Sequence, residues 1–258
     1  MGQDFAGRRV LVTAGAAGIG RTIARRFAEG GARVFIGDVD DAALAAFRAE
    51  NKSIGAAKAD VADPRQVDAM FSEAMASLGG LDILVNNAGI AGPTAAVESI
   101  SPADWDRCVA INLNGMFYCT RRAVPLIKAS GGGSIVNLSS VAGRLGYPMR
   151  TPYAASKWAV VGFTKSLAME LGPAKIRVNC IQPGIVEGPR IDRVIDAKAR
   201  ALNLSFDEMK EKLLANTSLR SSVTADDVAA MALFVCSNAG ARITGQALSV
   251  CGDVQVLT

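Results

Sequence analysis

Residues 8–38 constrain the fold more than any other stretch of this chain. The aliphatic run Arg8–Thr13 predicts a strand, the glycine-rich segment Ala14–Gly20 predicts a turn, and the periodicity of Arg21–Glu29 predicts a helix. A second strand, Ala32–Asp38, is expected to follow. A glycine-rich turn between a strand and a helix presents bare backbone N–H groups to an anion at the positive end of the helix dipole. The segment therefore predicts a site for a phosphorylated ligand.

Asp38 ends the second predicted strand, 18 residues after Gly20. An acid at this place in a dinucleotide-binding unit accepts hydrogen bonds from the adenosine ribose. Its charge repels the additional phosphate of NADP, and neither Val39 nor Asp40 supplies a positive charge. We therefore expect NAD as the cofactor. The alternative, that the glycines only let strand and helix pack closely, does not explain why turn, helix, strand and acid occur together.

Strands and helices alternate along the rest of the chain. The further expected strands are Ile54–Lys58, Leu81–Asn87, Ser134–Leu138, Ile176–Ile181 and Ala247–Val250, and the further expected helices are Pro64–Leu78, Asp104–Lys128, Ala154–Leu171 and Ala225–Cys236. This alternation predicts an α/β fold, a doubly wound parallel sheet with helices on both faces, in one domain over residues 1–258. Residues 185–222 break the pattern, and we interpret them as a candidate substrate lid; a surface excursion without a role is the alternative.

The 258 residues include no histidine, which excludes Ser-His-Asp and Cys-His catalysis and His-ligated zinc. We expect no metal. The net charge of +4 is scattered, and no apolar stretch is long enough for a membrane span, so neither nucleic acid nor a membrane is an expected partner. The five cysteines form no C-x-x-C pair, which predicts reduced thiols in a cytoplasmic protein.

Tyr153 and Lys157 are four residues apart, so a helix beginning near Pro152 places them on one face. A phenol with its ordinary pKa near ~10 is a poor base at neutral pH, but a nearby ammonium favours the phenolate. Lys157 is placed to supply that charge. In a chain without histidine, this pair is the simplest candidate for the acid–base group.

These motifs together resemble those of the short-chain dehydrogenase/reductase family, in its short, single-domain branch. The resemblance covers nearly the whole chain and rests on Thr13–Gly20, Asn86–Gly89, Asn112, Ser140, Tyr153 with Lys157, and Pro183 with Gly184. It implies a seven-stranded, Rossmann-like sheet in the order 3-2-1-4-5-6-7 and hydride transfer between a carbinol and a nicotinamide.

The resemblance also implies roles for individual residues. Tyr153 is the acid–base, Lys157 lowers its pKa and holds the nicotinamide ribose, Ser140 steadies the substrate oxygen, and Asn112 links the lysine to a water chain. The implied cofactor contacts are Gly15, Gly18, Ile19, Gly20, Asp38, Asp60, Val61, Asn87, Ala88, Gly89, Tyr153, Lys157, Pro183, Gly184 and Val186.

Three positions depart from the family's pattern. Ala14 stands where a glycine is usual, which widens the turn and requires space for a methyl group. Gly188 replaces a threonine that contacts the cofactor, and Cys251 begins a C-terminal segment that is usually Asp-Gly-Gly.

Arginines near the site raise the hypothesis of an anionic substrate. Arg150 stands three residues before Tyr153, Arg144 follows Ser140, and Arg190 lies in the lid candidate. Arginine binds carboxylates and phosphates well, although these side chains could equally be solvated or paired with acids.

We therefore expect an NAD-dependent oxidoreductase for a small secondary alcohol or ketone. The alternatives are a 3-oxoacyl-thioester reductase, which the NAD preference opposes, and a catalytically silent nucleotide-binding regulator. The resemblance further implies a homo-oligomer, a dimer or tetramer, paired through the helices Asp104–Lys128 and Ala154–Leu171.

Overall fold

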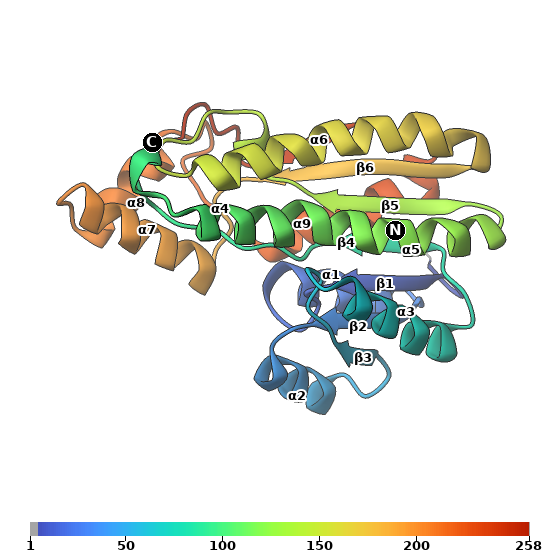
Figure 1. The fold of residues 1–258 in the computed structure, drawn as a ribbon. Coiled ribbons are helices and arrows are strands. Elements are labelled where there is room, and N and C mark those ends of the chain that lie inside the picture. Colours follow the sequence, from blue (N-terminus) through green and yellow to red (C-terminus); the bar gives the residue numbers. More distant parts are fainter. Residues whose placement is uncertain (1–4, 258) are drawn as a thin grey trace.

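The computed structural model describes residues 5–257 and contains one seven-stranded sheet (Figure 1). The strands are β1 (Arg9–Thr13), β2 (Arg33–Asp38), β3 (Gly55–Lys58), β4 (Ile83–Asn86), β5 (Gly133–Leu138), β6 (Ile176–Pro183) and β7 (Ala247–Val250). All neighbouring pairs are parallel, and the order is β3-β2-β1-β4-β5-β6-β7. The predicted fold class and strand order are confirmed.

Helices cover both faces of the sheet (Figure 1). They are α1 (Gly18–Glu29), α2 (Asp41–Glu50), α3 (Pro64–Leu78), α4 (Pro102–Val109), α5 (Gly115–Ala129), α6 (Thr151–Leu171), α7 (Pro189–Ala201), α8 (Phe206–Ala215) and α9 (Ala225–Cys236). On one face α1, α2 and α9 bury Phe27, Phe47 and Val228 against the strands. On the other face α3, α5 and α6 bury residues such as Phe71 and Ile127.

The structure differs from the sequence prediction in two helical regions. Helix α2 was not predicted; it begins where the Asp40 carboxylate accepts a hydrogen bond from the backbone N–H of Ala43. The single helix expected over residues 104–128 is two helices, α4 and α5, joined by the π-helical turn Ala110–Asn114. This turn holds Asn112, and such turns concentrate at functional sites.

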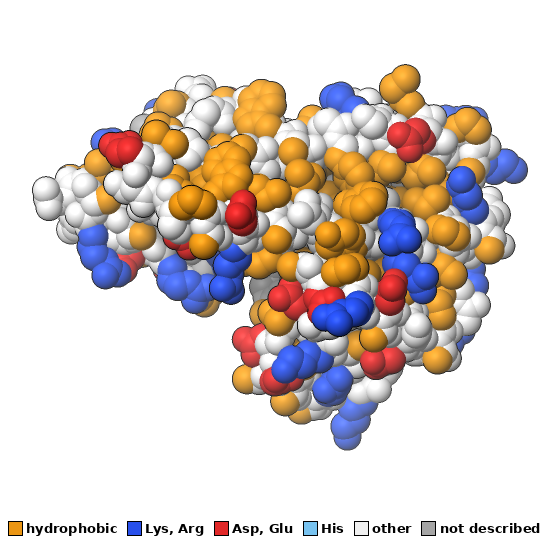
Figure 2. Space-filling view, viewed as in Figure 1, with side chains coloured by type: hydrophobic (Ala, Val, Ile, Leu, Met, Phe, Trp, Pro, Cys, Tyr) orange, Lys and Arg blue, Asp and Glu red, His pale blue; other side chains and the backbone are white. Residues whose placement is uncertain are grey.

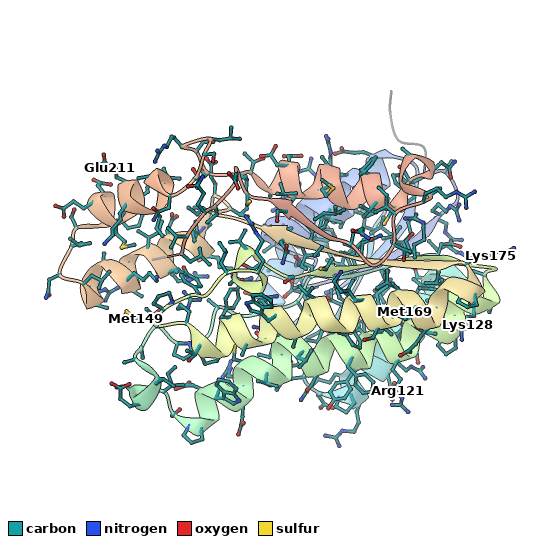
Figure 3. All side chains as sticks on the ribbon, turned by 90° about the horizontal axis from the view of Figure 1, so that it is seen from above. Arg121, Lys128, Met149, Met169, Lys175 and Glu211 are labelled. Carbon is teal, nitrogen blue, oxygen red and sulfur yellow. The ribbon has the colours of Figure 1, made fainter. Side chains whose placement is uncertain are left out.

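Residues 185–222, the predicted lid, form the hairpin of α7 and α8. Its small core consists of residues such as Ile195, Met209 and Leu213, and Ile185 joins that core from the end of β6. Seen from above, Met149 lies between the start of α6 and this hairpin (Figure 3). The hairpin therefore stands beside the loop that precedes Tyr153.

Candidate functional site

The turn from β1 into α1 has open backbone donors. Helix α1 begins at Gly18 and has no side-chain cap, so its first N–H groups lack side-chain partners. Gly18 has a φ of +52°, and a side chain at Gly20 would collide with the carbonyl of Ala14. The predicted turn contacts Gly15, Gly18, Ile19 and Gly20 all lie here. A dinucleotide's phosphates fit this arrangement because the turn is compact and rich in glycine, and the first N–H groups of α1 have no side-chain cap.

Ala14 accommodates its methyl group at an energetic cost. Its φ is 48°, in the left-handed region that favours glycine. For alanine this conformation costs roughly 1 kcal/mol. The departure at Ala14 therefore introduces strain at the start of the turn.

Asp38 connects the glycine-rich turn to the end of β2. Its carboxylate accepts hydrogen bonds from the N–H groups of Ala16 (3.0 Å), Val39 (2.8 Å) and Asp40 (3.2 Å). An ionised carboxylate has about four acceptor positions, so one more hydrogen bond can be accepted. The residue is mostly buried and is held beside the turn by these contacts.

The segment after β4 lies close to both the turn and Lys157. Asn87 donates through Nδ2 to the carbonyls of Thr13 and Ala14, and the Thr13 hydroxyl accepts from the N–H groups of Asn87 and Ala88. A Cβ at Gly89 would lie 3.4 Å from Nζ of Lys157. Glycine at this position lets the backbone approach the lysine.

The other predicted cofactor residues lie after the carboxyl ends of β3 and β6. Asp60 accepts a hydrogen bond from the N–H of Ala62, and Val61 is buried. Pro183 ends β6, and Val186 pairs with Val223 in an isolated bridge. Ligands of doubly wound sheets bind beyond these strand ends.

The two remaining family departures have visible structural settings. Gly188 precedes α7 with φ 129° and ψ 175°, a conformation essentially reserved for glycine, so a threonine would not fit without a change of backbone. Cys251 packs against Gly184, where a side chain would approach the Cys251 backbone within 2.8 Å.

Ser140, Tyr153 and Lys157 come together at the start of α6. Ser140 follows β5, and its side chain caps a short turn by accepting from the N–H of Ala142. Lys157 is buried and donates from Nζ to the carbonyl oxygen of Leu138 over 2.7 Å. Its Nζ lies 5.7 Å from the centroid of the Tyr153 ring. The helix register and the end of β5 thus assemble the three side chains predicted from the sequence.

The surroundings of Tyr153 favour its phenolate. Burial by itself raises the pKa of the phenol, but the charge of Lys157 and then that of Arg190 lower it. A hydrogen bond with Ser140 and the charge of Arg150 lower it further, so the net shift of the pKa is downward. Burial also lowers the pKa of Lys157. The pair is arranged for proton transfer nearer to neutral pH than a free tyrosine allows.

Asn112 is fully buried beneath this site and fixed by several hydrogen bonds. Its Oδ1 accepts from the N–H of Ile90 over 2.7 Å, and its Nδ2 donates to the carbonyl of Ile90 and the hydroxyl of Ser156. A Cβ placed on Gly89 would lie 3.0 Å from Asn112 Oδ1 and near Lys157. The π-helical turn brings this amide toward the lysine.

The three predicted arginines have different settings. Arg144 donates to the carbonyl of Val254 over 2.9 Å, which attaches the loop to the C-terminal segment. Arg190 is exposed at the start of α7 and forms no ion pair within the described part of the chain. Arg150 is only 1% exposed. Of the three, Arg150 is the one buried beside Tyr153, with its Cζ 5.3 Å from the ring centroid.

Lys198 belongs to the same region and was not predicted. It is 1% exposed, and its Nζ lies 4.3 Å from the centroid of the Tyr147 ring. Burial, then the charges of Arg150 and Lys212, lower its pKa to about 8. A lysine in a helix as charged as α7 looks solvent-exposed in the sequence, so only the packing of the hairpin identifies it.

Comparison with known proteins shows to which family the chain belongs. A family profile described as Enoyl-(Acyl carrier protein) reductase matches residues 14–253. The chain belongs to the short-chain dehydrogenase/reductase family. It is accordingly an oxidoreductase that acts on alcohol or ketone groups of small molecules, and members of this family use NAD or NADP.

Three similar proteins illustrate the range of this short-chain dehydrogenase/reductase family. The 2-dehydro-3-deoxy-L-rhamnonate dehydrogenase (NAD(+)) of Sphingomonas sp. (strain SKA58) is 44% identical over 74% of this chain and 76% of its own. The 3-oxoacyl-[acyl-carrier-protein] reductase of Staphylococcus aureus (strain Mu50 / ATCC 700699) is 34% identical over 96% of this chain and 98% of its own. The crystal structure of NAD+-bound xylitol dehydrogenase matches with a TM-score of 0.91 and 27% identity, over 96% of this chain and 99% of that one.

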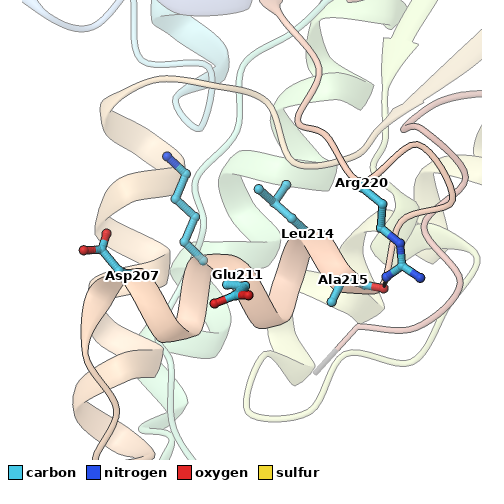
Figure 4. Close-up of a pocket in the computed structure, with 6 residues that line it drawn as sticks. Asp207, Glu211, Leu214, Ala215 and Arg220 are labelled. Atoms are coloured by element: carbon cyan, nitrogen blue, oxygen red, sulfur yellow. Dashed lines mark hydrogen bonds between the residues drawn. The ribbon is translucent and has the colours of Figure 1, made fainter.

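A separate hollow lies outside this site, along α8 and the loop after it (Figure 4). Its lining residues, Asp207, Lys210, Glu211, Leu214, Ala215 and Arg220, carry both charges. Arg220 donates to the carbonyl of Ala215 across it. None of the predicted site residues lines this hollow.

Between residues 5 and 257, no helix is both long and apolar enough to cross a membrane.

Proposed function

We propose that this protein is an NAD-dependent dehydrogenase that oxidises a small secondary alcohol, or reduces the corresponding ketone. The observation that carries this proposal is the group formed by buried Ser140 and Lys157 with the partly buried Tyr153, beside the open turn of β1 and α1. When bound, the nicotinamide supplies the two-electron acceptor for the substrate's hydride.

The side chains then have distinct roles. Tyr153 takes the proton of the substrate hydroxyl, because Lys157 and Arg190 lower its pKa. Ser140, which contributes to the lowered pKa of Tyr153, orients the substrate oxygen. Lys157 holds the nicotinamide ribose, and Asn112 supports the backbone next to it through Ile90.

NAD is proposed over NADP because of Asp38. Its carboxylate is fixed beside the turn and opposes an added ribose phosphate, while Val39 next to it is apolar and exposed. The names of the Sphingomonas relative and of the xylitol dehydrogenase structure both include NAD, which supports this choice.

The proposal includes a substrate with an anionic group. Arg150 is buried beside Tyr153, and the Sphingomonas relative is named for an acid, a rhamnonate derivative.

The second candidate is a 3-oxoacyl-thioester reductase, which the Staphylococcus relative supports by its name. Asp38 opposes this candidate, because such biosynthetic reductases usually take NADPH. A catalytically silent regulator is disfavoured by the assembled Ser140, Tyr153 and Lys157.

We also propose that the protein is a homo-oligomer, a dimer or tetramer, of the cytoplasm. Large apolar side chains are exposed on α4, α5 and α6, at Trp105, Phe117, Trp158 and Met169. Figure 2 shows hydrophobic side chains gathered over these helices, and a second copy could cover them. The described cysteines are free, which supports a reducing compartment.

One screen tests the proposed reaction. Purified protein is incubated with a panel of secondary alcohols, hydroxy acids and 3-oxoacyl thioesters, with NAD(H) and NADP(H) in parallel, and nicotinamide absorbance is followed. Turnover of an alcohol with NAD supports the proposal. Turnover confined to oxoacyl thioesters with NADPH supports the second candidate, and nucleotide binding without any turnover supports the silent regulator.

A further inference from the structure

Arg150 joins the loop before α6 to the segment that follows β4. Its Nη2 donates to the carbonyl of Ala91 over 2.6 Å, and the carbonyl of Met149 accepts from the N–H of Ala95 over 3.0 Å. Arg150 is 1% exposed and forms no ion pair with any residue between 5 and 257. Burying a charge without an ion pair costs free energy, so stability alone does not explain an arginine at this position.

The same guanidinium contacts two tyrosine rings. Its Cζ lies 5.3 Å from the centroid of the Tyr147 ring and 5.3 Å from that of the Tyr153 ring. A guanidinium is planar and rigid, so it stacks on aromatic faces while its N–H groups donate within its own plane. One rigid group therefore makes both the contact with Tyr153 and the hydrogen bond to Ala91. The position of the Tyr153 ring is coupled in this way to the backbone at Ala91.

The backbone next to Ala91 is held from a second direction by Asn112. The Asn112 amide accepts from the N–H of Ile90 over 2.7 Å and donates to the carbonyl of Ile90 over 3.1 Å. Ile90 and Ala91 are consecutive, so the π-helical turn fixes one residue and Arg150 fixes the next. Gly89, a proposed cofactor contact, immediately precedes them. Arg150 thus connects the cofactor side of the site to the catalytic tyrosine.

The charge of Arg150 acts on Tyr153 together with other groups. Burial raises the pKa of Tyr153, and the groups that lower it are, in decreasing order, Lys157, Arg190, Ser140 and Arg150. The titratable groups around Arg150 itself are the phenols of Tyr147 and Tyr153, the guanidinium of Arg190 and the thiol of Cys108. The ammonium of Lys198 contacts Tyr147 from α7. Arg150 therefore contributes charge as well as geometry to the acid–base.

We propose that Arg150 is a positioning residue for the acid–base, because its guanidinium couples the ring of Tyr153 to residues 89–91 and keeps a positive charge beside that ring. This inference rests on the proposed role of Tyr153. It does not depend on the charge of the substrate, since these contacts are made within the protein itself. Arg150 should therefore affect the turnover of neutral alcohols, which recognition of an anionic substrate would not require.

Three variants separate the charge of Arg150 from its hydrogen bond to Ala91. Arg150→Lys keeps the charge, Arg150→Gln keeps a donor without the charge, and Arg150→Met keeps neither. The matched control is Arg200→Met, which removes an exposed arginine charge from α7. Thermal unfolding shows whether each variant is folded, and Arg150→Gln gives the test of the charge if Arg150→Met does not fold.

The first measurement is the pH dependence of kcat/KM with NAD and a neutral secondary alcohol. We expect the profiles of Arg150→Gln and Arg150→Met to move to higher pH, because loss of a positive charge disfavours the phenolate. In Arg150→Met, kcat at pH 7 should fall about 10-fold to 100-fold, as for a misplaced catalytic group. Arg150→Lys should recover most of the profile, and Arg200→Met should behave as wild type. Unchanged profiles in both neutral variants, or a loss confined to KM for anionic substrates, overturn the inference.

The second measurement needs no turnover. The sequence has only three tyrosines, Tyr118, Tyr147 and Tyr153, so Tyr147→Phe and Tyr153→Phe assign the ionisation steps seen in the ultraviolet absorbance of tyrosinate. With NAD present, the step of Tyr153 should move to higher pH in Arg150→Gln and Arg150→Met and stay in place in Arg200→Met. A step that does not move in the Arg150 variants overturns the inference. Absence of turnover with every alcohol overturns the proposed function separately.

Discussion

Arg150 lies over the ring of Tyr153, with its Cζ 5.3 Å from the ring centroid, and so places a buried positive charge next to the proposed acid–base. The charge contributes to the lowered pKa of Tyr153. The same guanidinium donates to Ala91 and retains unused donors. One residue thus connects the proposed proton transfer with the proposed recognition of an anionic substrate.

Tyr153→Phe should reduce kcat by about 1000-fold or more, because positioned acid–base catalysis contributes roughly 10²–10⁴. NADH binding, measured by fluorescence titration, should change by less than about threefold since the ring remains in place. Tyr147→Phe is the matched control and should retain turnover. Substantial activity in Tyr153→Phe would contradict the assignment.

Arg190→Met should move the pH profile of alcohol oxidation to higher pH. The Arg190 charge is among the causes that lower the pKa of Tyr153. Removing a positive charge disfavours the phenolate and raises that pKa, so the rise of kcat/KM should begin at higher pH. The comparison is with Arg200→Met, for which an unchanged profile is expected. An Arg190→Met profile that coincides with wild type would show that its charge does not act on Tyr153.

Asp38→Ser combined with Val39→Arg should reverse the cofactor preference. The change removes the charge that opposes the ribose phosphate and adds one that attracts it at an exposed position. We expect the ratio of kcat/KM for NADP to that for NAD to rise by about 100-fold, or about 2.7 kcal/mol. Val39→Arg alone should have a smaller effect. A wild-type enzyme that already prefers NADP would refute the role given to Asp38.

Ala14→Gly should stabilise the protein. Ala14 has a φ of 48°, which glycine adopts without strain, although glycine also loses more entropy on folding. The net gain in the free energy of unfolding should be up to about 1 kcal/mol. The control is Ala24→Gly, because Ala24 lies inside α1, where glycine costs roughly 1 kcal/mol relative to alanine. Denaturant titration measures both variants.

Local patterns in the sequence predicted most of the fold. Neighbouring residues and periodicity can be read directly from the sequence. They predicted the strand, turn and helix of residues 8–29, the acid at the end of β2 and the later alternation of strands and helices. The pair Tyr153 and Lys157 belongs to the same class, because four residues in a helix place two side chains on one face. These features determined the fold class and the candidate acid–base.

Tertiary structure decided the rest. The sequence does not show that Arg150 is buried, that Arg144 donates to Val254, or that Lys198 crosses from α7 to Tyr147. Each of these facts depends on contacts between segments that are distant in the chain, and a charged residue in sequence looks the same whether it is solvated or buried. The sequence likewise did not show the π-helical turn that holds Asn112. The sequence by itself therefore determined the family and its candidate acid–base pair. The burial of Lys198 against Tyr147, by contrast, depends on how the hairpin of α7 and α8 packs beside the loop before Tyr153.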